Sequence, residues 1–168
     1  IRICAFLPAA EAVEVAGDSM TRVAGTDCFE RQLPPGSVIE KHPLLRWQSK
    51  RTSEWHTTQC PYSFGPQLGE MDLYLLGEGR HFEAWKVLGA RLKTIDGVAG
   101  CLFAVWAPAV QRVSVVGEFN EWDGRRNPMR CRGSSGIWEL FIPGLVAGHA
   151  YKYEILGSHG QLVRKTDP

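Results

Sequence analysis

The sequence lacks the features that would assign it at once to a membrane protein or a nucleic-acid-binding protein. No apolar run approaches the roughly 20 residues that a membrane-spanning helix needs. The 19 Lys and Arg residues nearly balance the 18 Asp and Glu residues, which leaves a formal net charge of +1. With no strong excess of either sign, charge gives no reason to expect nucleic acid or an anionic membrane as a partner.

Cysteines are few, odd in number and widely separated: Cys4, Cys28, Cys60, Cys101 and Cys131. Without a close pair they favour neither a disulfide framework nor a structural zinc site. His56 precedes Cys60 by four residues, but a second pair of ligands is missing. We therefore expect reduced, mostly buried thiols in a cytoplasmic protein, with no metal and no other cofactor.

Catalytic motifs are also absent. The chain has no Gly-x-Ser-x-Gly elbow, no phosphate-binding loop and no Cys/His pair in a supporting context. Glycoside cleavage by a retaining mechanism needs two carboxylates about 5–5.5 Å apart, and no motif fixes such a pair here. Glu118 and Glu121 are interpreted as solvated loop charges, so no catalytic residue is predicted.

The start of the chain carries no signal peptide, and its first residue is Ile1 rather than Met. This pattern indicates an internal piece of a longer protein.

What the sequence does contain is an internal repeat, within a composition of 18 Gly and 10 Pro that favours many short strands. Four sites recur at an offset of 100: Pro8-Ala9 with Pro108-Ala109, Val13 with Val113, Val15 with Val115, and Gly17 with Gly117. Further on, Phe29-Glu30 corresponds to Trp138-Glu139, and Leu45-Arg46-Trp47 to Tyr151-Lys152-Tyr153. Cys60-Pro61 corresponds to Asp167-Pro168.

Each copy has strand patterns broken by Gly, Pro and Asn. The first predicts strands near 2–7, 12–16, 27–32, 44–50 and 53–58; the second, near 101–106, 112–116, 137–142, 149–156 and 161–165. The predicted fold class is all-β: two immunoglobulin-like β-sandwiches in tandem, joined by a short helical linker. We place the first sandwich at 1–68, the linker at 69–96 and the second sandwich at 97–168.

The linker contains apolar residues that include spacings of three and precede Gly89: Leu73, Leu76, Phe82, Trp85 and Leu88. This spacing predicts a helix over 81–88, with 72–79 a turn or short helical segment before it. Trp85 is predicted to be a core residue between this helix and a sandwich.

The stretch from Val113 to Trp122 predicts a strand that stops at Gly117 and a loop that carries Asn120 and Trp122. Trp beside such a turn is usually a rim-of-core residue, but its flat face also suits the apolar side of a sugar ring. Together with Phe103–Pro108 and Tyr151–Glu154, this stretch resembles carbohydrate-binding module family 48, the sandwich that precedes the catalytic barrel of glycogen branching enzymes. Asp72–Leu75 and Gly77–His81 resemble the segment that joins the two amino-terminal domains of long bacterial branching enzymes.

The resemblance implies a non-catalytic amino-terminal segment of a 1,4-α-glucan branching enzyme of the α-amylase superfamily. The parent chain would be the enzyme, with its catalytic carboxylates on a (β/α)8 barrel absent from this segment. The segment would position glucan chains and support the barrel. Two alternatives remain open: a free-standing glucan-binding or regulatory module, and the leading part of a debranching or trehalose-forming relative.

In glucan-binding relatives that the chain resembles, the loop Trp stacks on glucose and a strand Lys donates to its hydroxyls. Trp122 and Lys152 stand at those positions, with Asn120 as a further polar contact. Such relatives often add a second aromatic residue where this chain has Leu162, Val163 and Arg164. We therefore expect weak binding of maltooligosaccharides, about millimolar. The alternative is that Trp122 packs against the barrel or the linker helix.

The first copy has Asp18–Arg22 where the second has Glu118–Trp122. It therefore lacks both the Trp and the Asn, and we expect it to bind glucan poorly or not at all.

Overall fold

A computed structural model describes residues 1–167 of the chain. Pro168, the end of the predicted second sandwich, lies outside the described residues. The chain forms two compact units, Ile1–Ser63 and Phe64–Pro168. Both are built of antiparallel sheets, which confirms the all-β prediction of two sandwich-like halves; the division into 1–68, 69–96 and 97–168 stays a prediction.

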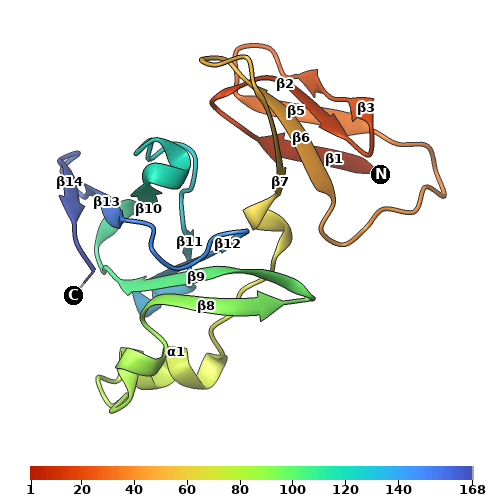
Figure 1. Ribbon diagram of the computed structural model, residues 1–168. Helices are drawn as coiled ribbons and strands as arrows, with labels where there is room; N and C mark the ends of the chain where they lie inside the picture. The colour runs from red at the N-terminus through yellow and green to blue at the C-terminus, as the bar shows by residue number, and fades with distance from the viewer. Residues whose placement is uncertain (168) are drawn as a thin grey trace. The chain divides into compact units, whose positions relative to one another are not determined.

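The first unit contains a three-stranded and a four-stranded sheet (Figure 1). The first sheet is ordered β1 (Arg2–Phe6), β5 (Cys28–Gln32), β4 (Thr21–Arg22). The second is ordered β3 (Asp18–Ser19), β2 (Ala10–Val15), β6 (Leu44–Ser49), β7 (Trp55–Gln59). Alternate residues of these strands face inward and form one core, which includes Ala5, Val13, Phe29, Leu45 and Trp47.

The second unit also has two sheets. One is ordered β11 (Arg130–Cys131), β12 (Ile137–Pro143), β9 (Val98–Trp106), β8 (Gly89–Ile95). The other is ordered β10 (Val110–Gly117), β13 (Tyr151–Gly157), β14 (Leu162–Lys165). Phe103 of β9 packs edge-on against Tyr151 of β13, with ring centroids 5.0 Å apart, so these two residues lie between the sheets.

The β9–β12 sheet is covered on its other face as well. Leu102 and Phe141 form a core with Phe64, Leu68 and Leu73, the last from helix α1 (Glu70–Gly77). Figure 1 shows α1 beside β8 and β9. Because both faces are covered, residues 137–142 are buried without interruption instead of alternating.

A buried carboxylate fastens the segment before α1 to this face. Glu139, which is 1% exposed, accepts hydrogen bonds from the backbone N–H groups of Gln67 (3.1 Å) and Leu68 (3.0 Å). It also pairs with the guanidinium of Arg132, which donates to the Leu68 carbonyl at 2.9 Å. The charge of Glu139 is thus balanced by one cation and two amide donors.

The strand registers test the repeat in detail. Ala5 pairs with Phe29, and Val105 pairs with Trp138, so the correspondence of Phe29 with Trp138 is confirmed. Val15 pairs with Leu45, whereas Val115 pairs with Tyr153. The predicted correspondence of Leu45 with Tyr151 is therefore wrong by two residues. A shift of two keeps each side chain on the same face, which is why the sequence pattern did not expose it.

The predicted helix over 81–88 is wrong. The α-helix lies earlier, at Glu70–Gly77, where the sequence predicted a turn or short helical segment over 72–79. Residues 81–88 contain only a 3₁₀ turn, Ala84–Lys86. Trp85 is 69% exposed, so its prediction as a core residue is also wrong. The predicted linker further contains β8, which pairs with β9 along its whole length. Three more 3₁₀ turns lie at Pro61–Ser63, Glu118–Asn120 and Gly133–Ser135.

All five cysteines are free, but Cys101 alone is buried, which corrects the expectation of mostly buried thiols. Within residues 1–167, no three His, Cys, Asp or Glu side chains are grouped so that they could hold a metal ion. No helix in this range has the length and apolar character to cross a bilayer.

Candidate functional site

Asn120 is a buried residue that fixes the loop after β10. It is 1% exposed, and its amide nitrogen donates to the Val115 carbonyl and to Oδ1 of Asn127, both at 2.8 Å. Its Oδ1 accepts from the Gly117 N–H at 2.9 Å. With both donor hydrogens and the oxygen engaged inside the protein, Asn120 supports the loop and presents no free polar group at the surface.

Trp122 lies two residues further on, half-buried, in an unusual backbone conformation. Glu121 and Trp122 both adopt left-handed φ angles, 57° and 59°. The Trp122 N–H donates to the Gly117 carbonyl at 2.9 Å, and the Trp122 carbonyl accepts from Nη2 of Arg164 at 3.0 Å. Consecutive left-handed residues with side chains are costly, so these contacts hold the loop in a conformation it would otherwise leave.

Lys152 lies on β13, opposite Val116 of β10. Its neighbours Tyr151 and Tyr153 face the other sheet, so alternation places Lys152 and Glu154 on the outer face. Arg164 bonds both Glu154 and the Trp122 carbonyl, so the backbone of Trp122 lies at this same outer face. The structure therefore places Lys152 and the backbone of Trp122 at one face of one sheet.

The layer order bears on the alternative packing of Trp122. Helix α1 covers the outer face of the β9–β12 sheet, whereas the Trp122 loop covers the outer face of the β10–β13–β14 sheet. Two sheets separate the Trp122 loop from α1, so Trp122 does not pack on this helix. The helix predicted over 81–88, which the sequence-based alternative named, is a 3₁₀ turn at Ala84–Lys86.

Glu154 is the electrostatic centre of the outer face. Its side chain is 5% exposed and accepts from Nε and Nη2 of Arg164 (3.1 and 3.0 Å) and from Nη2 of Arg112 (3.3 Å). Gly124 of the loop lies directly against it: a Cβ at that position would stand 1.9 Å from Oε1 of Glu154. The loop thus rests on a paired, buried carboxylate.

The tip of the loop carries further charges. Arg125 donates to both carboxylate oxygens of Asp123, and these hydrogen bonds lower the pKa of Asp123. Burial lowers the pKa of the Arg126 guanidinium, which lies 3.9 Å from Glu121. The side chain of Glu121 is 48% exposed, in agreement with its interpretation as a solvated loop charge.

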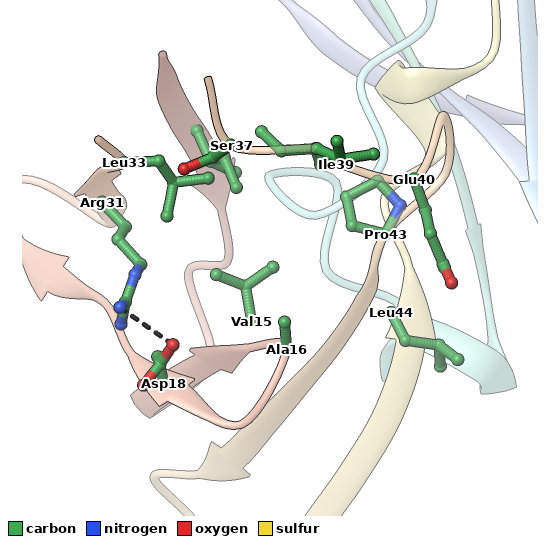
Figure 2. A pocket seen from close by; sticks show the side chains of 12 residues that line it. Val15, Ala16, Asp18, Arg31, Leu33, Ser37, Ile39, Glu40, Pro43 and Leu44 are labelled. Carbon is green, nitrogen blue, oxygen red and sulfur yellow. Dashed lines mark ion pairs between the residues drawn. The ribbon is translucent and has the colours of Figure 1, made fainter. Parts of the chain in front are cut away.

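The first unit lacks the Trp122 loop and the lysine of this surface. On the outer face of its corresponding sheet it carries Trp55, which is 39% exposed and lies beneath the guanidinium of Arg46. The corrected register aligns Lys152 with Leu44, which is 53% exposed. Leu44 lines a pocket of about 540 Å³, with the Asp18–Arg31 ion pair (2.9 Å) on another wall (Figure 2). The lining is mostly aliphatic and includes no aromatic ring, so it offers no stacking platform for a sugar.

The sequence predicts Trp122 and Lys152 as site residues, and they stay a prediction; it did not indicate the groups that hold the loop. In the sequence, Arg164 is marked only by its position, where glucan-binding relatives often have an aromatic residue. Its partner Glu154 lies directly opposite on the neighbouring strand. A cross-strand pair of opposite charge is the signal that could have identified it, once the register was known.

The family and the relatives found by comparison with known proteins agree with one another. The family described as carbohydrate-binding module 48 (isoamylase N-terminal domain) matches residues 87–168. The 1,4-alpha-glucan branching enzyme GlgB of Thiobacillus denitrificans is 79% identical over 164 residues, covering 98% of this chain and 22% of that protein. GlgB of Methylococcus capsulatus is 52% identical, covering 99% of this chain and 23% of that protein.

Among solved structures, a PulA mutant from Klebsiella pneumoniae aligns with 97% of this chain and 18% of its own, with a TM-score of 0.40 and 18% identity. A similarity of this size supports no functional argument. The chain spans less than a quarter of the length of the GlgB relatives named above. By sequence, residues 87–168 belong to carbohydrate-binding module 48, and the chain as a whole corresponds to the amino-terminal segment of the bacterial GlgB branching enzymes of the α-amylase family.

Proposed function

We propose that this chain is the non-catalytic amino-terminal segment of a 1,4-α-glucan branching enzyme, in which the second sandwich holds an α-glucan through Trp122 and Lys152. The parent enzyme would cut an α-1,4 glucan and rejoin the released end through an α-1,6 bond during glycogen biosynthesis. The observation that supports the proposal is that Lys152 and the backbone of Trp122 lie at the same outer face, with the Trp122 carbonyl bonded to Arg164.

An indole and an ammonium on one face suit a glucose ring. The apolar side of the sugar stacks on the indole, and the ammonium donates to its hydroxyls. Asn120 acts indirectly, since its amide is engaged within the loop. With one aromatic platform, the gain from stacking little exceeds the cost of ordering a flexible chain, so a dissociation constant near about 1 mM, or about 4 kcal/mol, is expected.

The segment would also support the rest of the parent chain. Phe82 and Trp85 are 94% and 69% exposed, which is unusual for large apolar side chains so close together in sequence. They form a docking surface for the catalytic barrel.

The segment alone should form no branches in amylose or glycogen, because the described residues include no carboxylate pair placed by a catalytic motif. An assay of the purified segment for new α-1,6 bonds measures this directly. Branch formation above that of a heat-denatured control would contradict the non-catalytic assignment.

The glucan site is tested by titrating maltoheptaose into the wild type, Trp122→Ala and Trp55→Ala while tryptophan fluorescence is followed. Trp55 lies in the first unit and is 39% exposed, so it provides a matched control. Wild type and Trp55→Ala should saturate alike, and Trp122→Ala should not. No saturable change in the wild type, or an unchanged response in folded Trp122→Ala, would remove Trp122 from the site.

A further inference from the structure

Arg164 joins the loop that carries Trp122 to the sheet beneath it. Its Nη2 donates both to the Trp122 carbonyl and to Glu154 Oε2, each at 3.0 Å, and its Nε adds a second bond to the same carboxylate oxygen at 3.1 Å. Glu154 is the cross-strand partner of Arg164, and its side chain is 5% exposed. One guanidinium thus connects a buried carboxylate on β13 to the backbone of the loop.

The connection acts where the backbone is strained. Glu121 and Trp122 are consecutive residues with φ angles of 57° and 59°, a conformation that disfavours residues with a Cβ. Without a restraint, the pair would relax toward common backbone angles. Because the indole is attached to one of these residues, such relaxation would change its position.

Gly124 completes the contact from the other side. It is buried, and a side chain there would place Cβ 1.9 Å from Glu154 Oε1. The loop can rest on the carboxylate only because this position has no Cβ.

We propose that Arg164, acting with Glu154, is a positioning residue that holds the indole of Trp122 in the orientation that binds an α-glucan. This proposal rests on the glucan site proposed above. The role of Arg164 depends on its contact with the loop that carries Trp122. This contact distinguishes Arg164 from Arg112. Arg112 donates to the other oxygen of Glu154 at 3.3 Å, from the opposite strand β10.

The two arginines provide a matched test in the 1–168 chain. Maltoheptaose is titrated into the wild type, Arg164→Gln and Arg112→Gln while the indole N–H signals are followed by NMR, and urea unfolding is recorded in parallel. Both variants lose one partner of the same carboxylate, so both should unfold at lower urea. Only Arg164→Gln should bind maltoheptaose about tenfold more weakly, which corresponds to about 1.4 kcal/mol. In the absence of maltoheptaose, the indole N–H signal of Trp122 in this variant should shift or broaden relative to the wild type.

Saturable wild-type binding with an Arg164→Gln affinity within twofold of it would overturn the proposal while leaving the glucan site intact. Equally weakened maltoheptaose binding in Arg112→Gln would also overturn the proposal, since the weaker binding would then follow from the loss of stability that both variants share. Absence of saturable binding in the wild type would overturn the proposed site, and this proposal with it.

Gly124→Ala distinguishes positioning from direct contact of Arg164 with the sugar. It leaves Arg164 in place but forces the loop and Glu154 apart. Weakened binding in folded Gly124→Ala supports the positioning role. If Gly124→Ala binds maltoheptaose with wild-type affinity while Arg164→Gln binds it more weakly, Arg164 contacts the sugar itself. That result would overturn the positioning role.

Discussion

At the scale of single residues, Asn120 stabilises the loop after β10 by providing hydrogen-bond partners for buried polar groups. Its side chain pairs with the Gly117 N–H, the Val115 carbonyl and Asn127, all in a buried turn. Removing it would leave buried polar groups without partners, which is costlier than the loss of the bonds alone.

We therefore predict that Asn120→Ala lowers the free energy of unfolding of the second unit by about 2–3 kcal/mol. Urea unfolding can be followed at the indole of Trp138, which is buried in this unit. Glu118→Ala, an exposed change in the same 3₁₀ turn, is the control and should cost less than about 0.5 kcal/mol. Equal costs in the two variants would show that the turn does not depend on the Asn120 amide.

A second residue-scale prediction concerns acid stability. Hydrogen bonds from Arg125 lower the pKa of Asp123 in the folded state. Its ionised form therefore adds stability above the unfolded-state pKa, about 3.9, and this contribution is lost as pH falls through the folded-state pKa. The stability difference between the wild type and Asp123→Asn should thus be largest near neutral pH and vanish well below about pH 4. Urea unfolding across this range measures it; a constant difference would contradict the assignment.

At the scale of elements, Glu139 determines whether the segment before α1 stays on the sheet. It is a buried carboxylate whose partners are Arg132 and two backbone N–H groups. Removing the charge of one partner in such a cluster leaves the other uncompensated.

Glu139→Gln should therefore release residues 64–77 at a cost of the order of 3 kcal/mol. Hydrogen exchange at the amides of Gln67, Leu68 and α1 should accelerate, with β10 and β13 little affected. Glu70→Gln is the matched control, because Glu70 contacts the same arginine at 3.2 Å while its side chain is 91% exposed. Equal acceleration in both variants would show that Glu139 is not the anchor.

The same elements show how much of the fold could be predicted from the sequence. Alternating residues ending at Gly117 or at Pro predicted the strands of both copies, because burial of one face imposes a period of two. The helix was misplaced because a spacing of three, as in Phe82–Trp85–Leu88, also matches the three residues per turn of a 3₁₀ helix. The spacing of Leu73 and Leu76 did indicate the turn or short helical segment over 72–79, which α1 confirms. Strand β8 does alternate apolar and polar residues in Ala90-Arg91-Leu92-Lys93, but this strand pattern was missed because these residues were assigned to the linker.

The candidate site was predicted to a similar extent. A family motif was enough to select Trp122 and Lys152, but the role of Asn120 depends on where its amide is buried. Arg164 and Gly124 matter through contacts with Glu154, which is distant from Gly124 in sequence. Such contacts require the strand register, and the sequence repeat had part of that register wrong by two residues.

At the scale of the whole molecule, the duplication has produced two units with different surfaces. The second carries Trp122 and Lys152, whereas the first has Arg22 and Leu44 at the corresponding positions. We infer that the first unit sets how far along a glucan the parent enzyme cuts, and that the second holds the chain.

Removing the first unit, Ile1–Ser63, from the parent enzyme should therefore change the lengths of transferred chains more than it changes folding. The deletion ends at Ser63 and not at the predicted boundary of residue 68, because Phe64 and Leu68 belong to the second unit's core. The first unit has its own core, so this shorter deletion leaves the second unit's core complete. Chain-length profiles of debranched product, compared with thermal unfolding of both enzymes, measure the two effects. Unchanged branch lengths would count against this role.

We expect the outer face of the second sandwich, and not the first sandwich, to contact the glucan. Six tryptophans are distributed over the chain, two of them, Trp47 and Trp55, in the first unit. In the indole region of the ¹H–¹⁵N spectrum, added maltoheptaose should move the Trp122 signal along a saturating curve and leave Trp47 and Trp55 in place. A stationary Trp122 signal, or saturable movement of Trp55, would contradict the account.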